Sequence, residues 1–299
     1  MRAVVAWLLV ALAAGWVAVR LFGLERGFPL VQLMAFTPFA AVAAVAVIGV
    51  AALLRQRLAA LVAAVLALAL VVVVAPRALG GPDDREGQRL RVLSVNMHFG
   101  TGSPEALAGL ARRMRADVVS VQELRGDLDA ELEAAGFLPA RVLEPPESPR
   151  IGLFSREPLE PRGVVRHRDR IIAVSAGLGD VEIVAVHPSA PIRATSAWRD
   201  DLRGLPPATP DGALRVLAGD FNATLDHAEL RRLLGTGYVD AADEVGAGLR
   251  GTWPHGRRLP PPVTIDHVLA DSRIGVREFS VHAIPGTDHR AVFAELVLP

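Results

Sequence analysis

The feature that most constrains this chain is a set of three apolar blocks within its first 76 residues. Residues 3–22 are apolar except Arg20, residues 30–54 contain only Gln32 and Thr37 as polar side chains, and residues 58–76 contain none. A helix needs about 20 apolar residues, with a range of about 17–25, to cross the hydrocarbon core of a bilayer. The sequence therefore predicts three transmembrane helices at about 3–22, 30–54 and 58–76.

Two other interpretations of these blocks are weaker. A cleaved signal peptide would account for the first block, but not for two more directly behind it. Buried core helices of a soluble protein rarely continue so far without a charged residue. We therefore expect residues 1–76 to form a membrane anchor that contacts the lipid bilayer.

The orientation of the anchor depends on its short loops, because positively charged short loops stay in the cytoplasm. Arg2 precedes the first block, and Arg55 and Arg57 fill the turn between the second and third. Residues 20–26 between the first two blocks carry two arginines and one glutamate, so the two sides are nearly matched. We favour a cytoplasmic amino terminus, which predicts a multi-pass protein of the cell membrane with its remaining chain outside the cytoplasm. The chain has no cysteine, which fits either compartment.

The charge of the remaining chain does not suggest a nucleic-acid partner. The sequence has 32 basic and 32 acidic residues, of which residues 1–76 hold five and one. The remainder therefore has 27 basic and 31 acidic residues, a net charge of −4. A basic stripe of the kind that binds nucleic acid is not evident.

Residues 77–89 are polar and contain glycine, and we expect them to form a linker. Residues 90–299 then form one α/β domain of ordinary size. Apolar runs bounded by turn residues predict strands, and capped amphipathic stretches predict helices. The expected strands are 90–95, 117–121, 151–154, 171–176, 181–186, 214–217, 265–269, 276–282 and 291–298, and the expected helices are 103–115, 127–135 and 194–205.

Polar residues follow several of these strands directly. In LRVLAGDFNAT, Asp220 and Asn222 are two positions apart, so on an extended backbone their side chains project to the same side. Turn formation alone could explain such a pair. Ligands of α/β folds, however, bind where strands end, and a set of carboxylates, amides and imidazoles there suits a hard cation such as Mg²⁺. The set comprises Asn96, Glu123, His187, Asp220, Asn222, Asp266, Asp288 and His289.

Six segments that carry these residues resemble, in this order, the motifs of the endonuclease/exonuclease/phosphatase superfamily, which includes deoxyribonucleases, abasic-site endonucleases, inositol polyphosphate 5-phosphatases and neutral sphingomyelinases. They are RVLSVNMHFG, VSVQEL, VAVHPSAP, AGDFNAT, TIDHVL and GTDHRAVF. The resemblance covers residues 90–299. It implies an α/β four-layer sandwich of two packed mixed β-sheets flanked by helices, and a phosphoric ester hydrolase that uses Mg²⁺, with Mn²⁺ as the alternative.

The resemblance also implies individual roles. Asn96 and Glu123 would lie at the metal, Glu123 as a direct ligand, and Asp288 would stand near it. His187 would contact the scissile phosphate. These assignments define the expected metal and phosphate sites.

The remaining four residues would act on the reacting atoms. Asp220 would orient or deprotonate the attacking water, and Asn222 would hold that water or a phosphate oxygen. His289 would stabilise the charged transition state, and Asp266 would hold its ring in one tautomer.

Other residues have weaker assignments. Trp253 and His255 in the loop GTWPHGRRLPPP are either substrate contacts, which we favour, or part of an irregular connection. His98 has no better than an even chance of touching substrate, and His267 is expected to be packed or at the surface. The histidines expected to be solvated are His167, His227 and His282.

The identity of the substrate is inferred from the predicted membrane anchor, because the motifs specify only the reaction. A tethered catalytic domain meets lipid headgroups at high effective concentration, and the layout resembles membrane-anchored bacterial members of the superfamily of the teicoplanin-resistance type. We therefore expect a phosphodiester, phosphomonoester or pyrophosphate of a lipid or lipid-linked envelope compound. The alternatives are an exported nuclease that cleaves DNA or RNA, and a non-enzymatic membrane protein that retains the fold.

Overall fold

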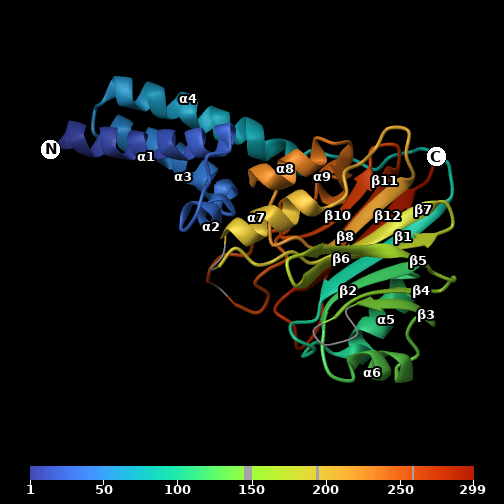
Figure 1. The fold of residues 1–299 in the computed structure, drawn as a ribbon. Coiled ribbons are helices and arrows are strands. Elements are labelled where there is room, and N and C mark those ends of the chain that lie inside the picture. The colour runs from blue at the N-terminus through green and yellow to red at the C-terminus, as the bar shows by residue number, and fades with distance from the viewer. Residues whose placement is uncertain (145–149, 193–194, 258) are drawn as a thin grey trace.

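The protein, described here by a computed structural model for residues 1–144, 150–192, 195–257 and 259–299, consists of a helical bundle and a β-sandwich (Figure 1). The bundle contains α1 (Arg2–Phe22), α2 (Leu30–Met34), α3 (Thr37–Leu53) and α4 (Arg57–Val74), which continues into the 3₁₀ helix η1 (Ala75–Ala78). Helix α3 packs along α4, and α1 contacts both. The bundle extends away from the sandwich, with the amino terminus at its far end (Figure 1).

Two helices of the described chain are long and apolar enough to cross a membrane, Arg2–Phe22 and Arg57–Ala78. The expected third span at 30–54 is wrong, because this block forms two helices, α2 and the 17-residue α3. Pro38 lies in the first turn of α3. Its missing N–H is harmless there, but in a continuous helix its ring would collide with the carbonyl four residues earlier.

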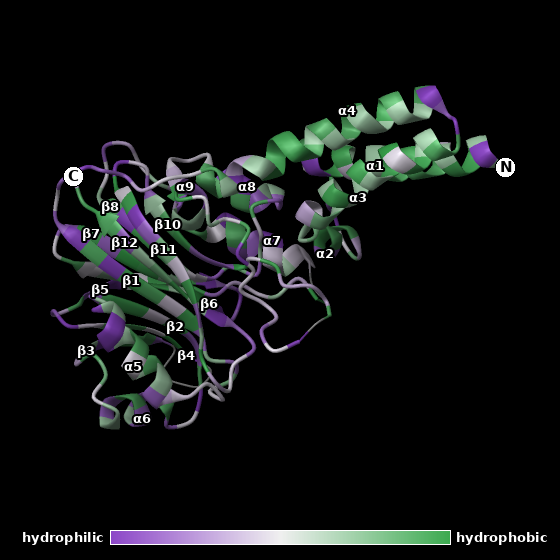
Figure 2. Cartoon of the chain, turned by 180° about the vertical axis from the view of Figure 1, so that it is seen from behind, coloured by the Kyte–Doolittle hydropathy of each residue, from purple (hydrophilic) through white to green (hydrophobic). Residues whose placement is uncertain are grey.

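The bundle packs through small side chains and leaves large apolar ones exposed. Alanines 41, 44 and 51 of α3 and alanines 59, 63 and 67 of α4 are buried, and small residues let helices approach closely. Leu12, Val42 and Leu68 are 72%, 72% and 62% exposed. The outer surface of the bundle is therefore apolar, as the hydropathy colouring shows (Figure 2).

The sandwich is built from two mixed six-stranded sheets, as expected. Strands β1 and β2 pair in parallel in the first sheet, as do β7 and β8 in the second, and the other pairs are antiparallel. The first sheet has the order β11 (Gly275–Ala283), β12 (Arg290–Val297), β1 (Arg89–Asn96), β2 (Val118–Leu124), β4 (Arg150–Ser155), β3 (Ala140–Glu144). The second has the order β5 (Glu160–His167), β6 (Arg170–Leu178), β7 (Val181–Val186), β8 (Leu214–Asp220), β10 (Asp266–Asp271), β9 (Tyr238–Asp240).

Helices cover the outer face of each sheet. Helices α5 (Pro104–Met114) and α6 (Leu128–Ala134) pack on the first sheet, and α7 (Thr195–Gly204) and α8 (Ala228–Leu234) pack on the second. Helix α9 (Ala241–Glu244) instead contacts strands of both sheets and adds Ala241 and Ala242 to the core between them. Because side chains alternate along a strand, Val92 of β1 faces the other sheet while Leu93 faces α5. The strands are thus buried on both faces, which explains their nearly continuous apolar sequences.

Residues 79–88 contain no helix and run along the sandwich until β1 begins at Arg89. The N–H of Gly81 donates to the Glu244 carbonyl at 3.0 Å, and that of Asp83 to the Val276 carbonyl at 2.8 Å. Just before this segment, the Arg77 carbonyl accepts from the N–H of Gly248 at 3.0 Å. The polar connection between bundle and sandwich is therefore bonded to the sandwich along its length.

Candidate active site

The site lies where the parallel strand pairs of the two sheets end at one shared edge. Asn96 ends β1, Glu123 lies near the end of β2, His187 follows β7 and Asp220 ends β8. The Asn96 amide donates to Glu123 Oε1 and to Asp220 Oδ2, both at 3.0 Å. One side chain thus joins the functional ends of both sheets.

Local backbone geometry turns Glu123 toward this edge. The register of β2 against β4 shifts between Val121 and Leu124, and Glu123 has a φ of 56°. Such a bulge adds a residue and redirects a side chain. His98, Phe99 and Asn222 also have positive φ, so four of the seven non-glycine residues with positive φ in the described segments belong to this site, where such strain commonly gathers.

Glu123 is held as a carboxylate. Burial opposes ionisation, but the hydrogen bond and charge of His187, with bonds from Asn96 and the Phe99 N–H, lower the pKa of Glu123 to about 2. The Phe99 N–H donates to Oε2 at 2.8 Å, and His187 Nε2 lies 3.4 Å from Oε1. The group is therefore ionised over any ordinary working pH.

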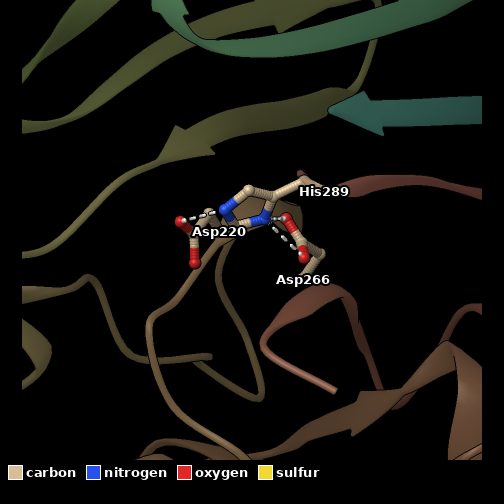
Figure 3. Close-up of side chains that lie close together, drawn as sticks. All are labelled: Asp220, Asp266 and His289. Carbon is tan, nitrogen blue, oxygen red and sulfur yellow. Dashed lines mark hydrogen bonds and ion pairs between the residues drawn. The ribbon is translucent and has the colours of Figure 1, made fainter. Parts of the chain in front are cut away.

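Asp220, Asp266 and His289 form a second, more buried group (Figure 3). Asp266 lies directly opposite Asp220 in the antiparallel β8–β10 pair. His289 Nδ1 lies 3.0 and 3.1 Å from the two Asp266 oxygens, and its Nε2 lies 3.8 Å from Asp220 Oδ2. The imidazole thus sits between two carboxylates.

Mutual charge sets the protonation of this group. Burial lowers the pKa of His289, but the Asp266 and Asp220 carboxylates outweigh it and raise the pKa to about 10. Burial raises the pKa of Asp220; the His289 charge opposes this rise and the Asp266 charge adds to it. His289 is therefore an imidazolium at neutral pH.

Asn222 lies beside Asp220 and joins two loops. Its backbone N–H donates to Asp220 Oδ1 at 2.8 Å, and its amide nitrogen lies 3.4 Å from Asp220 Oδ2. The same amide donates to the Pro188 carbonyl at 3.1 Å. Asn222 therefore ties the loop after β7, which carries His187, to the end of β8.

Asp288 connects the loop at 253–255 to the site. Trp253 Nε1 donates to Asp288 Oδ2 at 3.0 Å, and His98 Nδ1 lies 2.7 Å from Oδ1. The His255 N–H donates to the Asp288 carbonyl at 2.6 Å, and its ring accepts from Arg290 Nε at 3.2 Å. His98 is thus an Asp288 partner, a contact that the sequence did not indicate.

Two sets of residues offer ligand atoms for a cation. Asp220, Asp266 and His289 place theirs within 4.8 Å of one another, and the His289 Nδ1 atom is bonded to Asp266. The residues predicted to lie at a metal also offer oxygen atoms: the Glu123 and Asp288 carboxylates are 14% and 17% exposed, and Asn96 Nδ2 donates to Glu123. Hard oxygen donors of this kind fit Mg²⁺ or Mn²⁺.

The remaining histidines are packed to different degrees. His267 is buried, with its ring nitrogens 2.7 Å from Asp240 and 2.8 Å from the Ala223 carbonyl. The expectation that His227 is solvated is wrong: it is 2% exposed, and its ring packs 5.1 Å from that of Trp198. His167 is partly buried beside Asp201, so it is not fully solvated either.

Comparison with known proteins identifies the arrangement. Residues 93–289 match the sequence profile of the Endonuclease/Exonuclease/phosphatase family. The chain belongs to this family. The matched segment of this endonuclease/exonuclease/phosphatase family protein runs from Leu93 to His289, and it contains all the predicted metal, catalytic and substrate-binding residues from Asn96 to His289.

Solved structures share the fold of the sandwich. A humanized TDP2 from D. rerio aligns with a TM-score of 0.57 and 16% identity, over 70% of this chain and 98% of that one. An AP endonuclease from Archaeoglobus fulgidus gives 0.55 and 14%, over 69% and 98%. An endonuclease/exonuclease/phosphatase from Beutenbergia cavernae gives 0.51 and 20%, over 71% and 72%. No curated protein sequence matches the chain, and identities this low show a shared fold alone.

Proposed function

We propose that this protein is a membrane-anchored, metal-dependent phosphoesterase of a lipid or lipid-linked envelope substrate, in the manner of the membrane-anchored branch that resembles teicoplanin-resistance-type proteins. The ester is a phosphodiester, a phosphomonoester or a pyrophosphate. Family membership and the convergence of Asn96, Glu123, His187, Asp220 and His289 support the reaction class. The observation that carries the lipid assignment is that the apolar bundle docks on the loop that follows Asp220 and Asn222.

This docking uses buried charges. Asp226 accepts a hydrogen bond from Arg20 of α1 at 2.6 Å and two from Arg77 of η1 at 2.7 and 2.8 Å. Arg20 and Arg77 are 7% and 5% exposed. Buried charges are tolerated only when they are paired in this way, so the two helices that could cross a membrane end on one aspartate of the catalytic loop.

Backbone and apolar contacts extend the same junction. Glu25 accepts from the Ala228 N–H at the start of α8, and His227 Nε2 lies 2.8 Å from the Val31 carbonyl of α2. Val31 itself belongs to the core beneath α7 and α8. Gln32 also bonds the Pro191 carbonyl in the loop after β7, so α2 lies against the loop that carries His187.

The arginines support an extracytoplasmic sandwich. Arg2, Arg55 and Arg57 are exposed at the end of the bundle far from the sandwich. At the near end, the positive charges of Arg20, Arg26 and Arg77 are offset in part by Asp226 and Glu25. Unpaired positive charge thus favours a cytoplasmic far end.

The chemistry follows from the positions of the groups. A water oxygen attacks phosphorus opposite the leaving oxygen; Asp220 accepts the proton of that water, the new P–O bond forms and the leaving P–O bond breaks. The His289 imidazolium, held by Asp266, stabilises the charge that develops on the phosphoryl oxygens, and His187 and Asn222 bind phosphate oxygens. A divalent cation held by Glu123, Asp288 and Asn96 would supply further positive charge to the phosphate.

A nuclease is the alternative, because a solved relative of this fold is TDP2 from D. rerio complexed with a single-strand DNA product. Proteins that bind nucleic acid neutralise phosphates with basic side chains. The chain beyond residue 76 has an acidic balance instead. The lipid assignment is therefore favoured.

The test uses the full chain in lipid nanodiscs. We expect Mg²⁺-dependent hydrolysis of a polyprenyl pyrophosphate, measured as released phosphate, or of a phospholipid, measured as the released headgroup. EDTA and Glu123→Gln should each abolish it, while Asp84→Asn on the exposed connection leaves it unchanged. Plasmid DNA should remain intact. Plasmid nicking that disappears in Glu123→Gln, with no release from lipids, would establish the nuclease instead.

A further inference from the structure

An apolar groove of about 410 Å³ lies between the bundle and the sandwich. One wall consists of side chains of α3 and α4, among them Phe39, Val42 and Val71. The opposite wall consists of three loop segments of the sandwich, 224–226, 248–249 and 262–264. The groove therefore joins the apolar outer surface of the bundle to the loops of the sandwich.

Two of these loop segments continue into the active site. Residues 224–226 begin two positions after Asn222. Val263 pairs with Trp253 through N–H···O bonds of 2.7 and 3.0 Å, and Trp253 donates to Asp288. A molecule in the groove would thus lie against the same loops that hold the phosphate-binding residues.

The lining suits hydrocarbon. Phe39 and Val42 are 45% and 72% exposed, and Leu249 across the groove is 44% exposed. The charged side chains of the lining, Arg77 and Asp226, bond each other, so neither demands a polar ligand. The volume lies within the range of about 300–1,000 Å³ that small-molecule sites occupy.

We infer that this groove binds the hydrocarbon chain of the lipid substrate, while the phosphate of the same molecule lies at Glu123, His187 and His289. The inference rests on the proposed function. The inference also extends the proposed function, because the groove selects among phosphate esters by the length of their hydrocarbon chain. The catalytic residues contact only the phosphate and do not distinguish chain lengths. Its α3–α4 wall is continuous with the apolar outer surface of the bundle, from which a lipid chain can enter without crossing water.

Chain-length dependence tests the inference with the full protein in nanodiscs. The substrates are monomeric p-nitrophenyl alkyl phosphates with alkyl chains of two to eight carbons. Each methylene withdrawn from water should raise kcat/KM by up to about fourfold until the groove is filled. Val42→Trp places an indole in the groove and should reduce the eight-carbon to two-carbon ratio by at least about tenfold, mainly through KM.

Leu68→Trp is the matched control, since Leu68 is 62% exposed on α4 and does not line the groove. It places the same indole on the bundle and should keep the wild-type ratio of eight-carbon to two-carbon substrate. Because substrate partitions equally into nanodiscs of either variant, this control also corrects for partition. Equal ratios in the wild type and both variants would overturn the inference while leaving the phosphoesterase intact.

A binding measurement separates failure of the groove from failure of the proposed function. An octyl phosphate with a diazirine at its chain end should label peptides that contain residues 224–226, 248–249 or 262–264 on irradiation. Labelling should fall at least about fivefold in Val42→Trp and stay unchanged in Leu68→Trp, whether or not the protein hydrolyses any ester. Labelling that is equal in the two variants would overturn the inference.

Discussion

The helical bundle and the sandwich differ in the side chains that they bury. The bundle buries alanine and exposes leucine and valine along its length. The sandwich buries valine, leucine and phenylalanine, and at one edge also a group of charged residues that includes Asp220, Asp266 and His289. The bundle therefore has an apolar outer surface that suits a lipid environment. The sandwich instead has an apolar interior that holds a cluster of charged side chains at one edge.

The arginines show the same contrast within one helix. Arg2 at the start of α1 is exposed, whereas Arg20 near its end is buried against Asp226. The difference lies in the partner and not in the residue, because arginine stays protonated in either place. The junction between the two regions thus depends on paired charges, and the following predictions test each region separately.

The largest effect should come from the catalytic edge. Asp220→Asn removes the proton acceptor and should lower kcat by about 10²–10⁴, and Glu123→Gln should be at least as severe because it removes a metal ligand. Neither change touches the bundle. Phosphate release and thermal unfolding of the full chain in nanodiscs measure the two effects, and a large fall in Tm would show that the residues hold the fold rather than catalyse.

The next effect should come from the junction. Asp226→Asn leaves two buried arginines without a countercharge and should lower the free energy of unfolding by about 3–5 kcal/mol. The matched control, Asp84→Asn, breaks an exposed pair with Arg277 and should cost less than about 1 kcal/mol. Chemical denaturation of the two variants measures these losses in the free energy of unfolding. Equal, small losses would mean that the bundle is held to the sandwich by apolar contacts alone.

Acid should weaken the same junction. Burial raises the pKa of Asp226, but Arg77 and Arg20 outweigh it and hold the pKa below its ordinary value. A carboxyl whose folded pKa is depressed contributes stability above its unfolded pKa of about 3.9 and loses it as pH falls through the folded pKa. The stability difference between the wild type and Asp226→Asn should therefore be constant from pH 7 to 5 and shrink below pH 4. A difference that does not change with pH would contradict this pairing.

The smallest effect concerns the loop that supports Asp288. Trp253→Phe removes one N–H donor to a carboxylate, worth about 1.5–3 kcal/mol, and should weaken Mg²⁺ activation by roughly 10- to 150-fold. Trp7→Phe on the outer surface of α1 is the control and should leave the Mg²⁺ dependence unchanged. If both variants require the same Mg²⁺ concentration, Trp253 has no role in holding Asp288.

Sequence patterns predicted the core strands of both sheets, because strands buried on both faces have apolar sequences. They missed the edge strands β5 (EPRGVVRH), β3 and β9, of which β5 has mostly exposed side chains and β9 has only three residues. They also missed the short helices α8 and α9, of seven and four residues. Hydropathy also treated residues 30–54 as continuous, since an apolar average does not register the break at Pro38. The proline itself was visible in the sequence and would have predicted this break.

The candidate site residues could be proposed from the sequence because they lie at strand ends, after or within the ends of β1, β2, β7 and β8 and at the starts of β10 and β12. The junction could not be named. Arg20 and Arg77 meet Asp226 across 206 and 149 positions, and no local pattern relates residues so far apart. His98 and Asp288 meet in the same way, through the folded arrangement of two loops.

The attachment of α1 and η1 to Asp226 would limit which phosphates the active site can reach above the bilayer. Because buried ion pairs attach the bundle to the sandwich, the catalytic edge would stand at a fixed height above the bilayer. A phosphate would then be reached only if its own headgroup brings it to that height. Each residue inserted into both helices would raise the edge by about 1.5 Å and turn the helices by about 100°. Insertions of about seven or eleven residues, roughly 10 and 17 Å, would bring the helices back to within about 20° of their angle at Asp226. The height of the catalytic edge would therefore change in steps.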